Sequence, residues 1–323
     1  MNEFERIAQL FAPLSSNESG AFNLTDDAAI LSPTSGHSFV FTKDCIIESV
    51  HFIGDESPAL IAQKLLRTNL SDLAAMGATP RAYMLGLMLP RATSRSWFLS
   101  FIQGLAADQK QFGITLIGGD TTTGSALFTL SLTMIGEVKN NALLRSGAKP
   151  DDDVYVTGTL GDSVLGLELL KKTRACSNKD FHTYLTQRYF LPEPRIAIGQ
   201  SLSGLATAAM DISDGLIQDA EHIARASGCS ILLHAEALPL SNAARELLKD
   251  DKARLEVIAT GGDDYELLFS APISAREAIA GIAITHDTPI TRIGTVHKGN
   301  PFVTLLDANA RPIEFSKKGY MHR

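Results

Sequence analysis

The feature that most constrains the fold is an alternation of short apolar, strand-like segments with longer segments of helical periodicity. A leucine-rich helical segment begins at Ser57 and Pro58 and ends at Gly77, which are typical start and stop residues of a helix. A second helical segment, 97–112, lies between strand-like segments at 82–89 and 114–117. We therefore expect an α/β fold with α+β mixed sheets.

A second alternating block follows residues 146–153, a run of turn-forming and charged residues. A length of 323 residues also favours about two domains. We expect domains at 1–145 and 146–323. The further expected strands are 28–31, 39–42, 127–138, 154–157, 208–212, 231–234, 265–269 and 291–296, and the further helices are 2–12, 162–171, 194–203 and 214–226.

The charge balance argues against a general affinity for polyanions. Acidic residues outnumber basic ones by 36 to 29, which disfavours binding to nucleic acid or to an anionic membrane surface. The 3 scattered cysteines favour neither a disulfide framework nor a CxxC zinc site, and no apolar run reaches the ~20 residues that span a bilayer. We expect a cytoplasmic protein with neither nucleic acid nor membrane as a partner.

Several common catalytic motifs are absent from the sequence. It contains no P-loop, no protein-kinase glycine loop, no H-E-x-x-H zinc motif and no G-x-S-x-G nucleophile elbow. If the protein transfers a phosphoryl group, it must do so with a fold other than those of the P-loop enzymes and protein kinases.

Aspartates recur where apolar segments end, and one more, Asp72, lies inside the leucine-rich helix near Asn69. A carboxylate at the end of a buried strand is costly unless it is paired, caps a helix or binds a cation. Such oxygen ligands suit Mg²⁺, which usually shares them with substrate phosphates. The strand-end and loop aspartates are Asp26, Asp27, Asp44, Asp120, Asp211, Asp214, Asp263 and Asp264.

Each of these signals also has a simpler interpretation. Asp214 could cap the helix that begins at Gly215, without any metal. The run Gly118-Gly119-Asp120-Thr121 could bring backbone N–H groups close to a phosphate, or it could be a glycine-rich turn.

Taken together and in order, the motifs resemble the thiamine-monophosphate kinase family, in the wider group of aminoimidazole-ribonucleotide synthetase-like ATP-binding enzymes. The resemblance spans nearly the whole chain. The late motifs Gly261–Glu266 and Lys318–Tyr320 point to the thiamine kinases within the group. The matching segments are Asp26–Ala29, Thr42–Asp44, Val50–Phe52, Asn69–Ala78, Gly118–Thr121, Arg145–Pro150, Asp211–Leu216, Gly261–Glu266 and Lys318–Tyr320.

The resemblance implies a two-domain chain that forms a homodimer through its N-terminal strands and binds ATP with several Mg²⁺ ions. It would transfer the γ-phosphoryl group of ATP to thiamine monophosphate. The family pattern implies Mg²⁺ ligands at Asp27, Thr42, Asp44, Asp72, Asp120, Asp211 and Asp214, ATP contacts at Gly119, Asp120, Arg145 and Ser213, and substrate contacts at His51, Asp263 and Tyr320.

Clustered Mg²⁺ would neutralise the repulsion between donor and acceptor phosphates. The acceptor phosphate is already largely ionised near neutral pH. We therefore expect direct transfer with no covalent enzyme intermediate, and we assign no general base.

The sequence departs from the family pattern at three positions. Thr25 replaces a glycine in the first motif, Lys43 stands beside the proposed ligand Asp44, and Asp263 replaces a glutamate. Two alternatives remain open. The chain could be another ATP-using synthetase of the same group, or a catalytically silent protein that binds metabolites or serves as a scaffold.

Overall fold

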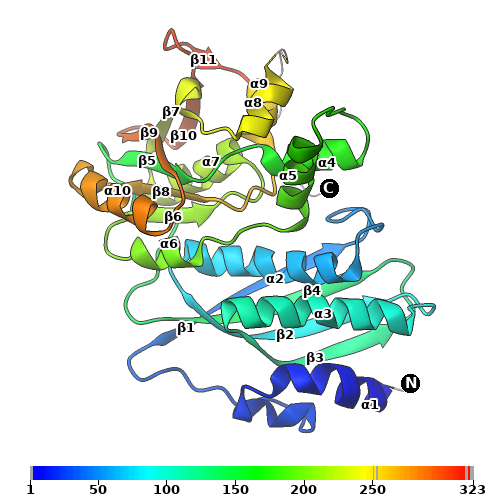
Figure 1. The fold of residues 1–323 in the computed structure, drawn as a ribbon. Coiled ribbons are helices and arrows are strands. Elements are labelled where there is room, and N and C mark those ends of the chain that lie inside the picture. The colour runs from blue at the N-terminus through cyan, green and yellow to red at the C-terminus, as the bar shows by residue number, and fades with distance from the viewer. Residues whose placement is uncertain (1–2, 250, 252–253, 317–318, 321–323) are drawn as a thin grey trace. The chain divides into compact units, whose positions relative to one another are not determined.

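We describe the protein from a computed structural model, which describes every residue except 1–2, 250, 252–253, 317–318 and 321–323. The chain divides into two compact units, and each is described here by itself (Figure 1). Unit 1 comprises Met1–Leu73 and Ala78–Asn140, and unit 2 comprises Ala74–Gly77 and Asn141–Arg323.

Unit 1 is built on a four-stranded mixed sheet with the strand order β1-β4-β2-β3. Antiparallel pairing joins β4 to β1 and to β2, whereas β2 and β3 are parallel. Helices α2 and α3 cover one face of this sheet (Figure 1). The bounds are β1 Ser38–Ile47, α2 Pro58–Ala75, β2 Thr79–Leu89, α3 Arg95–Phe112, β3 Thr115–Thr123 and β4 Thr129–Val138.

The helices of unit 1 form for the reasons that the sequence indicates. The leucines of α2 at 65, 66, 70 and 73 are fully buried, which is the apolar stripe that periodicity predicts. Ser94 caps α3 by accepting a hydrogen bond from the backbone N–H of Trp97, and the helix ends at Gly113 in the left-handed region. Both predicted helices are confirmed.

The first 37 residues differ from expectation in part. The helix expected at 2–12 is present as α1, Glu3–Arg6, followed by a π-helical turn, Ile7–Phe11; residue 2 lies outside the described residues. The chain then forms 3₁₀ turns at Ala12–Ser15 and Ser19–Leu24. The strand expected at 28–31 is wrong, because Ile30 is exposed and its N–H bonds to Gly20 O in a loop (2.8 Å).

Unit 2 contains a seven-stranded mixed sheet in the order β11-β10-β7-β9-β5-β8-β6. The mixed α/β class predicted from the sequence is therefore confirmed. The strands are β5 Asp153–Thr157, β6 Ala208–Asp211, β7 Ser230–His234, β8 Leu267–Ala271, β9 Ile290–His297, β10 Phe302–Leu306 and β11 Pro312–Ile313. The helices are α4 Asp162–Leu170, α5 Lys179–Phe190, α6 Ile196–Ser201, α7 Leu216–Ser227, α8 Asn242–Leu248, α9 Arg254–Thr260 and α10 Arg276–Thr285.

The predictions miss several elements of unit 2, and α5 shows why. This helix is rich in polar and aromatic residues, so it lacks a clear aliphatic stripe. Its stability comes from tertiary contact with α4, where a Cβ on Gly166 would lie 2.1 Å from Leu185 O. Helices α8, α9 and α10 and strands β10 and β11 are missed as well. No helix in the described part of the chain is both long and apolar enough to cross a membrane.

Candidate functional site

The first acidic group lies at the β1 edge of the unit 1 sheet. Thr42 and Asp44 are two residues apart in β1 and share the face toward α2, where the Thr42 hydroxyl donates to the Asp72 carboxylate. Burial raises the pKa of Asp44 to about 6, with the negative charge of Asp72 adding to this rise and a hydrogen bond from Thr68 opposing it. Two partly dehydrated carboxylates with neighbouring hydroxyls form a donor set that fits a hard divalent cation.

Lys43 does not disturb this pair. It lies between Thr42 and Asp44 in the strand, so its side chain extends from the opposite face. Its Nζ donates to Ser131 Oγ in β4 at 2.5 Å. The departure from the family pattern therefore places the ammonium group on the face away from the acidic pair.

The second acidic group lies at the β3 edge of the same sheet. Asp27, Gly119 and Asp120 line a cavity of about 230 Å³ together with Asp26 and Gly118. The Gly118–Asp120 run forms part of strand β3, so the alternative of a glycine-rich turn is wrong. A Cβ on Gly119 would lie 2.1 Å from Leu85 O, so close strand contact next to a register shift already requires this glycine.

Asp44 and Asp120 do not form one cluster within unit 1. Strands β1 and β3 are the two outer strands of the sheet and are separated by β4 and β2. Among the residues that the structure describes, no three His, Cys, Asp or Glu side chains form a group able to hold a metal ion. The predicted ligands of unit 1 thus lie at two opposite edges of its sheet.

The third group lies in unit 2, where four predicted site residues come together. Asp263 N–H donates to Ser213 O at 2.8 Å, and Tyr320 N–H donates to Asp214 O at 2.9 Å. The Gln218 side chain donates to both Asp214 Oδ2 and Tyr320 O, each at 2.9 Å. Lys318, from the same motif as Tyr320, lies outside the described residues.

No role is expected from the sequence for Asp219, which lies in the first turn of α7 and binds the turn of chain directly before the helix. Its Oδ2 accepts the backbone N–H groups of Ser213, Asp214 and Gly215, each at 3.1 Å. The alternative that Asp214 caps this helix is wrong, because among the described residues no side chain caps the start of α7 and the Asp214 carboxylate accepts the Gln218 side chain. Burial raises the pKa of Asp219 to about 7, and the charge of Asp214 contributes. An aspartate in the fourth position of a helix gives no sequence signal that it will bind the preceding backbone. It can do so only because residues 213–215 fold back toward its side chain.

Asp211 ends β6 and is buried, two residues before Ser213. Arg145 is exposed, and its carbonyl accepts a hydrogen bond from Ser227 Oγ at 3.2 Å. His51 Nδ1 accepts the Ile47 N–H at 3.1 Å, so the ring closes the turn after β1. In the structure, His51 therefore stabilises a local turn.

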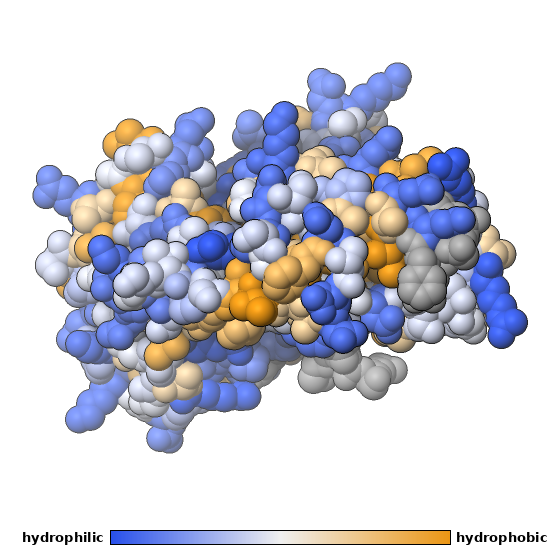
Figure 2. Space-filling view, turned by 90° about the horizontal axis from the view of Figure 1, so that it is seen from below, coloured by the Kyte–Doolittle hydropathy of each residue, from blue (hydrophilic) through white to orange (hydrophobic). Residues whose placement is uncertain are grey.

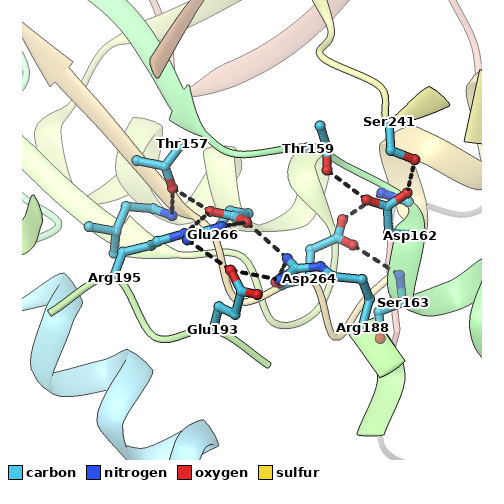
Figure 3. Close-up of polar contacts among 12 residues, drawn as sticks. Thr157, Thr159, Asp162, Ser163, Arg188, Glu193, Arg195, Ser241, Asp264 and Glu266 are labelled. Carbon is cyan, nitrogen blue, oxygen red and sulfur yellow. Dashed lines mark hydrogen bonds and ion pairs between the residues drawn. The ribbon is translucent and has the colours of Figure 1, made fainter. Parts of the chain in front are cut away.

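A buried charged network lies beside the loop that carries Asp263 (Figure 3). Glu266 is fully buried and forms ion pairs with Arg188 at 2.9 Å and with Arg195 at 2.6 Å. Asp264 accepts the N–H of Gly161 at 2.8 Å, and its complete burial raises its pKa well above the usual range. From the sequence, Asp264 is expected only as one of the strand-end and loop aspartates, and Glu266 has no expected role.

Comparisons with known proteins match each half of the chain to a family domain. Residues 25–138 match the family described as AIR synthase related protein, N-terminal domain, and residues 149–306 match the corresponding C-terminal domain. The thiamine-monophosphate kinase of Salmonella typhimurium is 40% identical over 328 residues, covering 99% of this chain and 98% of the relative.

Two solved structures are also similar. The crystal structure of thiamine-monophosphate kinase from Stenotrophomonas maltophilia K279a has a TM-score of 0.81 at 40% identity, covering 87% of this chain and 89% of that one. The structure of AaThiL complexed with AMPPCP and TMP has a TM-score of 0.79 at 30% identity, covering 94% and 98%. With both domains matched and 40% identity over its full length, the chain belongs to the thiamine-monophosphate kinase family.

Proposed function

We propose that this protein transfers the γ-phosphoryl group of ATP to the phosphate of thiamine monophosphate, forming thiamine diphosphate. The observation that carries the proposal is the relative at 30% identity, which holds the ATP analogue AMPPCP and TMP in one complex and matches 94% of this chain. Relatives named thiamine-monophosphate kinase at 40% identity favour this reaction over that of another synthetase of the group.

The proposed metal ligands are the acidic residues of both units. Asp44, Asp72 and the Thr42 hydroxyl would hold Mg²⁺ at the β1 edge, where burial and mutual repulsion favour a bound cation. Bound Mg²⁺ would neutralise the charge of the reacting phosphates. The remaining proposed ligands are Asp27, Asp120, Asp211 and Asp214.

We assign substrate contacts in the same way. Gly119, Asp120, Arg145 and Ser213 would contact ATP, whereas His51, Asp263 and Tyr320 would contact thiamine monophosphate. The bonds between Asp263 and Ser213 and between Tyr320 and Asp214 support adjoining nucleotide and substrate contacts in unit 2. These residues bind and orient the two phosphates for direct transfer, and no side chain needs to act as a general base.

The protein is proposed to form a homodimer through the strands of its N-terminal domain. Phe41 in β1 and Met84 and Met88 in β2 expose large apolar side chains from the unit 1 sheet, with Phe41 63% exposed. Figure 2, which views the molecule from below, shows hydrophobic side chains grouped among polar ones on the surface seen from that side. We place the enzyme in the cytoplasm, where its proposed donor, ATP, is available.

The test is coupled ADP release with ATP, Mg²⁺ and thiamine monophosphate, with formation of thiamine diphosphate followed by chromatography. Asp120→Asn keeps the side-chain shape but removes the proposed metal charge, so activity should fall at least about 100-fold. Asp55→Asn, in an exposed loop, is the matched control and should retain activity. ATP binding by the unmodified protein without turnover of thiamine monophosphate would instead support the silent-protein alternative.

A further inference from the structure

The loop that carries Asp263 has an unusual backbone. Asp263 and Tyr265 both have positive φ values, 65° and 52°, in the left-handed region that non-glycine residues seldom occupy. Such a conformation is strained and persists only where its surroundings hold it. Something in unit 2 must therefore hold this loop in place.

Backbone bonds provide part of that support. Asp263 N–H and Tyr265 N–H donate to Ser213 O and Ile212 O, both at 2.8 Å. Ile212 N–H donates to Glu266 O at 2.8 Å. These bonds extend the pairing of β6 and β8 up to the loop, and they tie Asp263 to the segment that carries Ser213.

The Glu266 side chain provides the rest by joining the loop to three other segments. Arg195 donates through Nε to Oε2 at 2.7 Å and through a terminal nitrogen to Oε1 at 2.6 Å, and Arg188 of α5 donates to Oε1 at 2.9 Å. Thr157, at the end of β5, donates to Oε2 at 2.7 Å and accepts the Leu267 N–H at 2.8 Å. Figure 3 shows these side chains converging on one carboxylate.

The backbone around Glu266 is shaped to admit it. A Cβ on Gly158 would lie 2.1 Å from Glu266 Oε1, and this glycine has a φ of 58°. Asp264 holds the other side of the loop through its bond to Gly161 N–H, directly before α4. A buried carboxylate with a bidentate arginine, a second arginine and a hydroxyl is a rigid anchor.

We propose that Glu266 is a positioning residue for thiamine monophosphate: through Arg188, Arg195 and Thr157 it holds the 262–265 loop so that Asp263 meets the substrate. This inference rests on the proposed function, because it takes Asp263 as a substrate contact. Glu266 itself is fully buried and acts only through the loop.

The decisive variant is Glu266→Gln, which keeps the side-chain size but removes the charge that holds both arginines. We expect kcat/KM for thiamine monophosphate to fall about tenfold or more, because a small displacement of a positioning group is costly. The KM for ATP should change by less. Initial rates are measured well below the melting temperature of each variant, so that only folded enzyme is compared.

Asp153→Asn is the matched control. Asp153 is a second buried carboxylate of the same sheet and pairs with Arg276 at 2.6 Å and Arg292 at 3.2 Å. It lies at the opposite end of β5 from Thr157, so it cannot hold the loop. This variant should lose stability while keeping the kinetic constants of the unmodified enzyme. A Glu266→Gln enzyme that is merely less stable, with unchanged kcat/KM, would overturn the proposal.

A second pair of variants keeps the proposal testable if Glu266→Gln does not fold. Thr157→Val removes the hydroxyl that bonds to Glu266 and should lower kcat/KM for thiamine monophosphate several-fold, whereas Thr157→Ser should restore it. Unchanged kinetics in Thr157→Val would contradict the proposal. If the unmodified enzyme does not turn over thiamine monophosphate at all, the proposed function fails, and this outcome is distinct from failure of the positioning role.

Discussion

At the residue scale, two kinds of environment stand out among the buried and partly buried carboxylates that the structure describes. Glu266, Asp153 and Asp108 each form ion pairs with arginine; the Arg67–Asp108 pair, at 2.8 Å, is an example. Asp44 and Asp219 instead lie near other carboxylates, and burial raises their pKa values to about 6 and about 7. The arginine pairs hold packed segments together, whereas the raised pKa of Asp44, a proposed Mg²⁺ ligand, is a kind of shift that is common at functional sites.

Asp44→Asn should stabilise the protein in the absence of metal. The substitution removes a partly buried charge that faces Asp72, so the melting temperature should rise by a few degrees. Mg²⁺ should raise the melting temperature of the unmodified protein but should have little effect on the variant. Thermal unfolding with and without MgCl₂ measures both effects, and an equal Mg²⁺ shift in the two proteins would remove Asp44 from the ligand set.

Asp153 predicts a defined pH dependence of stability. Its hydrogen bond with Arg276, assisted by Arg292, holds its pKa below the usual 3.8. A depressed pKa contributes stability that is present at neutral pH and is lost as the pH falls from about 5 through the folded-state pKa. Asp153→Asn should therefore cost about 1–2 kcal/mol at pH 7, a modest figure because both arginines are half-exposed. Urea unfolding at pH 7 and pH 3 should show the stability difference between the two proteins narrowing, and a difference that stays constant would contradict this explanation.

At the scale of single elements, close helix packing depends on particular glycines. A Cβ on Gly104 of α3 would lie 2.2 Å from Ala59 O and 2.7 Å from Ala59 Cα in α2. Gly281 of α10 offers a contrast, because no atom lies within 4 Å of the position that its Cβ would take. The same substitution should therefore have opposite effects on stability at these two helical positions.

We expect Gly104→Ala to destabilise unit 1 by about 1–3 kcal/mol, since the added methyl group must displace backbone. Gly281→Ala should stabilise the protein by about 0.5–1 kcal/mol, because it lowers the entropy of the unfolded chain without a clash. Urea unfolding of the two variants provides the comparison. A Gly104→Ala protein that is as stable as the unmodified protein would show that α2 and α3 can separate at little cost.

At the scale of the whole molecule, the proposed homodimer predicts how the protein behaves in solution. Phe41→Glu places a charge on the exposed apolar part of the unit 1 sheet and should halve the mass measured by light scattering. Ile284→Glu, on α10 in unit 2, is the control, because Ile284 is 82% exposed and belongs to a different unit from that sheet. An unchanged mass for Phe41→Glu would contradict assembly through this surface.

The sequence by itself determined the fold class, the long helices and the residue types of the candidate site. Periodicity identified α2, α3 and α7 because each buries one apolar face, and strand-end aspartates marked the segments rich in oxygen ligands. These are local signals, so they can be read without knowledge of distant contacts. The same approach failed at 28–31, where an apolar run packs against the unit 1 sheet as a loop and does not pair as a strand.

Only the tertiary structure decided how these residues are combined. Strand order separates Asp44 from Asp120 on opposite edges of one sheet, whereas backbone bonds join Asp263 to Ser213 and Tyr320 to Asp214. Glu266 acquires its role from distant partners such as Arg188, whereas Asp219 binds the backbone of the turn directly before its own helix. The physical reason is that burial, ion pairing and strand order depend on long-range contacts, which no local pattern of residues encodes.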